Sequence, residues 1–210
     1  DSISQEFYLF NRNGDIIKNS KIAHEGTFAK GSVILKKPGS DSQYYVFYTG
    51  LHTDSLCSPP RDPCFGLFYC IVDMYLNNNE GEVIIKDELV IQTSIAEGIS
   101  CTKHANGNDW WIVVHEAPSA LTDSCTNSFY KLLLTKEGFQ ECCTQKIGSK
   151  FCSNIWYAAG EPNFSKYGNR LAMVSPFEGL VEVFDFNRCT GEMYNHFNIE
   201  NSPDIEPYSS

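Results

Sequence analysis

The residues best suited to chemistry lie between positions 101 and 115 of this chain. The stretch carries His104, Asp109 and His115 beside two adjacent tryptophans. A histidine with a carboxylate can act as an acid and base or bind a metal ion. The two histidines stand eleven residues apart, however, and no third His or Cys lies at the spacing of a zinc motif. We therefore expect hydrogen bonds to the backbone and to tryptophan N–H groups, and predict no catalytic set, metal or cofactor.

The same stretch predicts a hairpin with a turn at Asn106 and Gly107. Glycine adopts positive φ without strain and asparagine does so more readily than most residues, which suits a two-residue turn. A strand is predicted over 110–114, where alternation sends Trp110 and Trp111 to opposite faces. We expect one tryptophan to pack between sheets and the other to fill the neighbouring interface or meet solvent. An exposed ring could stack on a sugar, so the candidate ligand-binding residues are Trp110 and Trp111, and the candidate structural positions are His104, Asn106, Gly107 and Asp109.

Other patterns that could carry chemistry are weaker. A hydrolase nucleophile at Ser119, Ser124 or Ser153 would need a Gly-x-Ser-x-Gly elbow, which the sequence lacks. The oxygen-rich run at 77–82 lacks the spacing of an EF-hand and is expected to be a hairpin turn. The chain has four arginines, too few to favour the arginine clamp of a sialidase-type propeller.

The charge and the cysteines bound the possible partners and the compartment. A formal charge of −10 and the lack of a Lys/Arg cluster disfavour nucleic acid, and no apolar run approaches the length of a membrane span. Nine cysteines without paired CxxC motifs favour an oxidising compartment. Cys57 and Cys64 flank a proline-rich loop, which predicts a local disulfide between them. The odd number leaves at least one thiol free or paired with another molecule.

Short apolar runs bounded by Gly, Pro, Asn or Asp recur throughout, and no window sustains a helical period, so the sequence predicts an all-β protein. Three segments repeat the order strand, polar turn, strand, and a second hairpin follows each of them. Aligning Tyr45, Trp111 and Leu171 gives spacings of 66 and 60 residues. Two hairpins supply four antiparallel strands, which is the content of one β-propeller blade.

The repeats predict about three and a half blades, part of a larger ring that a second chain or a second copy could close. The inserted loops expected over residues 49–65 and 116–128 are the places where binding contacts are predicted. The predicted divisions are the second hairpin of a blade at 1–20, blades at 27–95, 96–148 and 155–200, and a connector at 201–210.

Four segments carry a resemblance to a known family. They are Leu-Phe-Tyr-Cys-Ile-Val-Asp-Met with its Asn-rich turn at 67–84, Lys-His-Ala-Asn-Gly-Asn-Asp-Trp-Trp-Ile-Val at 103–113, the degraded copy at 163–172, and Phe-Asp-Phe-Asn-Arg-Cys-Thr-Gly at 184–191. In this order they resemble the WD40-like propeller domains of secreted Bacteroidota proteins, which often carry a type IX secretion sorting domain. The resemblance implies a cell-surface or extracellular propeller used in adhesion or interaction, and it supplies no catalytic residues. The sequence shows neither the secretion signal nor the sorting domain of that family.

The function expected from these features is a non-enzymatic, secreted or cell-surface scaffold for protein interaction or adhesion. A carbohydrate-binding or carbohydrate-active propeller is the alternative from another class, and a structural subunit of an extracellular assembly is a third. The expected partners are proteins or neighbouring blades or subunits, with glycans as a further possibility.

Overall fold

The fold consists of antiparallel strands, as the short apolar runs predict. The computed structural model describes residues 7–22, 31–52, 64–93, 95–96, 98–117, 125–151, 161–175 and 180–199. These residues form twelve strands and contain no helix. The expectation of an all-β protein is therefore confirmed. Among these residues there is accordingly no apolar helix that could cross a membrane.

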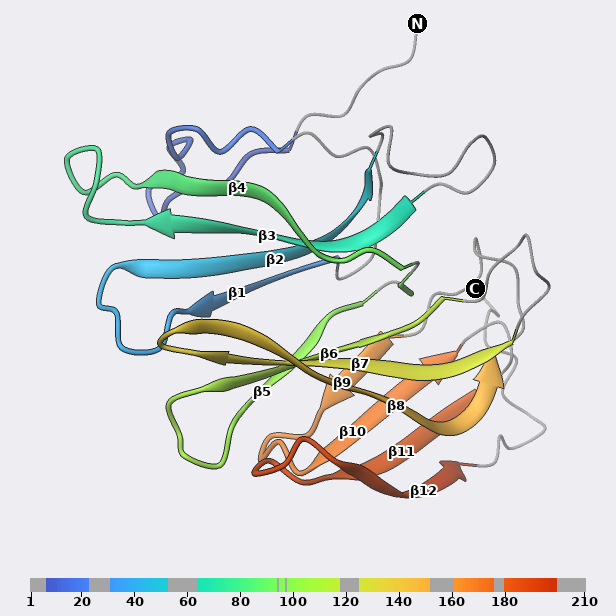
Figure 1. The fold of residues 1–210 in the computed structure, drawn as a ribbon. Coiled ribbons are helices and arrows are strands. Elements are labelled where there is room, and N and C mark those ends of the chain that lie inside the picture. Colours follow the sequence, from blue (N-terminus) through green and yellow to red (C-terminus); the bar gives the residue numbers. More distant parts are fainter. Residues whose placement is uncertain are drawn as a thin grey trace, which may run out of the picture.

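The strands form three sheets, and each sheet is a meander of four consecutive strands (Figure 1). The first sheet contains β1 (Ser32–Lys36), β2 (Gln43–His52), β3 (Cys64–Asp73) and β4 (Glu82–Ile91). The second contains β5 (Ser100–Lys103), β6 (Trp110–His115), β7 (Thr126–Thr135) and β8 (Gly138–Phe151). The third contains β9 (Glu161–Phe164), β10 (Arg170–Ser175), β11 (Leu180–Phe186) and β12 (Met193–Ile199).

Strands β2 and β3 run further than the sequence indicated. The loop expected over 49–65 is shorter, because the pairing continues to His52 opposite Cys64. On its other side, Gly66 of β3 lets β4 approach closely, since a Cβ there would lie 2.6 Å from the Ile91 carbonyl oxygen. The loop expected over 116–128 is shortened in the same way by β7.

The three sheets stack face to face, and apolar side chains fill the spaces between them (Figure 1). We call the face turned toward the next sheet in chain order the forward face, and the opposite one the backward face. On the third sheet the forward face is the one turned away from the second sheet. The first core, between the first and second sheets, contains Leu35, Tyr45, Phe47, Leu67, Ile71, Ile91, Ile95, Ile99, Ile112, Val114, Leu132 and Leu134. The second core, between the second and third sheets, contains Trp111, Val113, Phe129, Phe151, Leu171, Met173, Phe184, Phe186 and Met193. Removal of this apolar surface from water is the main stabilising contribution to the stack.

A short hairpin in residues 7–22 covers the backward face of the first sheet. Isolated bridges join its two halves, Phe10 pairing with Ile16 among them, so the expected strands are present only as short paired segments. Ile17 and Ile22 are buried against side chains of β2, β3 and β4. We call this element the N-terminal hairpin.

The structure corrects the alignment of the repeats by one residue. The first hairpin of each sheet is closed by a backbone hydrogen bond, from Lys37 to Gln43, His104 to Asp109, or Ser165 to Arg170. In each sheet, the residue two positions after the residue that accepts this bond lies on the forward face. These equivalent residues are Tyr45, Trp111 and Ala172. The alignment of Leu171 with Trp111 is therefore wrong, since Leu171 packs into the second core from the backward face. The spacing is 172 − 111 = 61 residues, and a slip of one residue moves a side chain to the opposite face.

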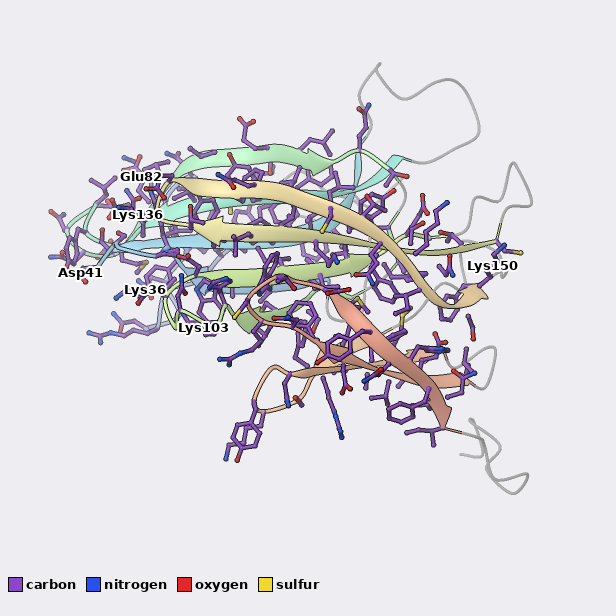
Figure 2. The ribbon with its side chains drawn as sticks, turned by 60° about the horizontal axis from the view of Figure 1, so that its bottom comes forward. Lys36, Asp41, Glu82, Lys103, Lys136 and Lys150 are labelled. Atoms are coloured by element: carbon purple, nitrogen blue, oxygen red, sulfur yellow. The ribbon has the colours of Figure 1, made fainter. Side chains whose placement is uncertain are left out.

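Hairpin turns of the first and second sheets gather at one end of the stack. Figure 2 shows Lys36, Asp41, Lys103 and Lys136 together at that end, while Lys150 on β8 lies at the opposite end. We call the hairpin formed by β5 and β6, which carries Trp110 and Trp111, the tryptophan hairpin. Its turn thus lies among turns of the neighbouring sheets, which can contact it from both sides.

Candidate functional site

The turn between β5 and β6 is closed largely by its own polar side chains. Asn106 accepts hydrogen bonds through Oδ1 from the backbone N–H groups of Asn108 and Asp109, at 3.0 and 3.1 Å. Its Nδ2 donates to Asp109 Oδ2 at 2.7 Å. Gly107 has φ +79°, but Asn106 does not have positive φ. The expected two-residue turn is therefore wrong: a two-residue type I′ turn needs positive φ at both positions, and this turn spans four residues between His104 and Asp109.

Trp111 joins this hairpin to the third sheet. Its indole Nε1 donates to the carbonyl oxygen of Arg188 at 2.8 Å, and its ring is buried in the second core. The turn between β11 and β12 accommodates the ring because Gly191 has no side chain, and a Cβ there would lie 2.6 Å from the indole. His104 Nε2 lies 3.1 Å from the carbonyl oxygen of Cys189 in the same turn. Trp111 and His104 therefore bind a neighbouring sheet.

Trp110 joins the hairpin to the first sheet, on the opposite side. Its Nε1 donates to the carbonyl oxygen of Lys36 at 3.1 Å, and its ring packs against the first core. The Lys103 ammonium lies 3.7 Å from the centre of the ring and donates to the Asn108 carbonyl oxygen at 2.8 Å. One face of this partly buried ring is therefore occupied by a cation–π contact, which limits its use as a sugar platform.

The two histidines that suggested a site are not brought together. His104 lies in the turn, whereas His115 is at the far end of β6 and is 1% exposed. The His115 ring packs edge-on against Phe129 and Phe151, with centroids 4.7 and 4.8 Å away. Burial lowers the pKa of His115 to about 4, and its Nε2 has no hydrogen-bond partner. This histidine is neutral at physiological pH and serves as a flat core side chain.

Polar groups in the second core were missed by the sequence reasoning. Lys131 is buried, and its ammonium donates to Gln145 Oε1 at 2.6 Å. Glu182 is also buried: its Oε1 accepts from the Ser149 N–H at 2.8 Å and lies 2.6 Å from His196 Nε2, while its Oε2 has no partner. Alternation could have revealed both, because Lys131 follows Phe129 by two positions and Glu182 precedes Phe184 by two.

Those buried groups tie the second sheet to the third. The Gln145 side chain donates to the carbonyl oxygen of Met193 at 2.6 Å and accepts from its N–H at 3.1 Å. The Ser149 bond to Glu182 crosses the same interface. In the part of the chain that the structure describes, no three His, Cys, Asp or Glu side chains converge in a way that could hold a metal ion.

The described cysteines are in different states, among them a buried thiol at Cys70 and an exposed thiol at Cys189. Cys125 is disulfide-bonded. Cys57 lies outside the described residues, so the Cys57–Cys64 bond stays a prediction. Cys70 is a buried thiol on β3, where burial first and then the Asp87 charge raise its pKa to about 12, which makes it a poor nucleophile.

The weaker candidate patterns of the sequence find no support as chemical sites. Ser119, Ser124 and Ser153 lie outside the described residues, as does the segment 201–210. The oxygen-rich run at 77–82 forms the turn between β3 and β4 and the start of β4, and its three asparagines all adopt positive φ. Positive φ is the conformation that asparagine tolerates in turns, so this run is explained without a bound ion.

Comparison of the chain with protein-family models, with curated proteins and with solved structures gave no match. The resemblance to WD40-like propeller domains therefore stays a prediction. What the chain does has to follow from its sheets, from the bonds between them and from the faces that they leave open.

Proposed function

We propose that the chain is a β-propeller-type scaffold of a secreted or cell-surface protein and that it acts through protein–protein contacts. The main support for this proposal comes from the bonds that the tryptophan hairpin makes. Its polar side chains, which looked suited to chemistry, bond to the turn itself or to backbone carbonyl groups of the first and third sheets. Such bonds give these side chains a structural role, which favours a scaffold over an enzyme.

The propeller arrangement is supported by the regularity of the stack. Each sheet has four strands in meander order, which is the content of a blade, and the forward faces of the first and second sheets each pack on the backward face of the next sheet. The second and third sheets also keep one orientation, since β5 lies beside β9 and β8 lies beside β12. Such a stack is rigid and leaves its loops and outer faces for recognition.

The disulfide at Cys125 supports an extracellular address. Disulfides persist in oxidising compartments and are rare in reducing ones. A scaffold exposed to proteases and shear outside the cell gains from such a cross-link, which limits the freedom of the unfolded chain.

The test separates protein recognition from sugar recognition. Wild-type protein and the Trp110→Ala variant are applied to an array of immobilised extracellular proteins and to a glycan array. We expect binding to proteins alone, changed less than about twofold by the substitution, since Trp110 contacts the first sheet and not a partner.

A control variant reports on folding. Trp111→Ala empties a buried site and is expected to cost about 3–5 kcal/mol of stability, so it loses binding through unfolding. Glycan binding by the wild type, abolished in Trp110→Ala at an unchanged melting temperature, would overturn the proposal and establish a lectin.

A further inference from the structure

The forward face of the third sheet is apolar and uncovered. Val174 on β10 and Phe197 and Ile199 on β12 are 39%, 47% and 51% exposed. Their register places them on one face, because Val174 pairs with Val181, which in turn pairs with Ile199. The forward faces of the first and second sheets are buried in the first and second cores. Only on the third sheet, among the described residues, is this face open to solvent.

The N-terminal hairpin, on the far side of the first sheet, carries a second exposed apolar patch. Phe10 and Ile16 of the N-terminal hairpin are bridge partners and are 59% and 56% exposed. Their neighbour Ile17 points the other way and is buried against the first sheet. Phe10 and Ile16 therefore face away from the stack and offer a backward-facing surface.

Charge on the forward face of the third sheet does not oppose such a contact. The Arg170 and Asp185 side chains on the third sheet form an ion pair at 3.2 Å, and Asn195 donates to the second carboxylate oxygen of Asp185 at 3.0 Å. Asp185 is the one carboxylate that β11 places on this face, and its charge is thus neutralised locally. A second apolar surface can approach it without burying an unpaired charge.

The direction of packing identifies what fits. Each covered forward face in this molecule meets a backward-facing apolar surface, and the N-terminal hairpin supplies one that is free. We infer that a second copy of this chain docks its N-terminal hairpin, through Phe10 and Ile16, on the forward face of the third sheet. This head-to-tail contact joins unlike surfaces, so repetition gives a closed ring or an open chain of copies. The inference rests on the proposed scaffold function and names its partner.

Sedimentation velocity across a concentration series, with three variants of the full chain, tests the contact. Phe197→Glu blocks the third sheet and Phe10→Glu blocks the hairpin, so each variant alone should be monomeric, with self-association weakened at least about tenfold. Lys136→Glu is the control, because Lys136 is exposed on the turn between β7 and β8 of the second sheet, which carries neither apolar surface. It should associate as the wild type does.

Mixing the two blocked variants gives the sharpest result. Each retains one intact surface, so an equal mixture should form dimers but nothing larger. If Phe10→Glu alone still dimerises while Phe197→Glu does not, the third sheets pair with each other and the inference is wrong. A wild type that stays monomeric up to about 100 μM would also overturn it.

Two controls keep these outcomes interpretable. Near-ultraviolet circular dichroism verifies the fold of each variant, and Ile199→Lys replaces Phe197→Glu if the latter unfolds. Failure of self-association leaves the array binding of the scaffold intact, whereas failure of the scaffold proposal appears as glycan binding. The two ideas can therefore fail separately.

Discussion

Replacement of His115 by phenylalanine should make the protein markedly more resistant to acid. His115 is almost fully buried among aromatic rings and its Nε2 has no partner. Burial disfavours the charged imidazolium and lowers the pKa from the ordinary 6.5 to about 4, although the nearby Glu116 opposes this shift. Phenylalanine fills a similar volume and cannot be protonated.

The direction of the effect follows from proton linkage. The unfolded chain binds a proton at His115 near pH 6.5, but the folded chain does so only near pH 4, so acid favours the unfolded state. The stability contribution of neutral His115 is complete above pH 6.5 and is lost progressively as the pH falls from 6.5 to below 4. Between pH 8 and pH 5 the loss is about 2 kcal/mol, and its limit below pH 4 is about 3 kcal/mol.

Urea unfolding at pH 8 and pH 5 measures this difference. The free energy of unfolding of the wild type should fall between these pH values by about 2 kcal/mol more than that of His115→Phe. Phe129→Leu is the matched control, because Phe129 contacts the His115 ring but does not titrate. It should lower stability and keep the wild-type dependence on pH. Equal pH dependence in the wild type and in His115→Phe would refute the reasoning.

Two further substitutions test the junction of the second and third sheets by thermal unfolding. Gly191→Ala should cost about 2 kcal/mol more than Gly107→Ala, since both glycines have positive φ but only the Cβ at 191 would strike Trp111. Equal losses would show that the indole moves aside. Lys131→Met should raise stability by about 1 kcal/mol, because a buried ammonium held by the Gln145 amide is replaced by an apolar chain of similar length. A loss would mean that the lysine holds Gln145 in place.

Alternation and turn residues were enough to predict the strands and the opposite orientation of the two tryptophans. They were not enough for the register of the third repeat. The segment before Leu171 contains a glycine at 168 that matches Gly107, and this match makes Ala172 the position equivalent to Trp111. The aligned bulky residues suggested Leu171 instead, but backbone closure of the hairpin decides which side chain faces forward.

The partners of the tryptophans could not be predicted in the same way. Trp110 and Trp111 donate to carbonyl oxygens of Lys36 and Arg188, which are 74 and 77 residues away in the chain. Backbone carbonyl groups occur at every residue, so no residue type marks them as acceptors. For the inward charges of Lys131 and Glu182 two sequence signals disagree. Alternation places both side chains inward, whereas a charged residue within a strand normally indicates the solvent face.

The position of the tryptophan pair follows from the place of its sheet in the stack. The second sheet is the one described sheet with another complete sheet on both faces, so two large rings on adjacent residues can both be covered there. The equivalent residues of the third sheet are Leu171 and Ala172, and Ala172 lies on the open forward face. A tryptophan at that position would extend the exposed apolar surface. The two adjacent tryptophans, which looked like a chemical site, are therefore explained by packing, because both faces of the second sheet are covered by other sheets.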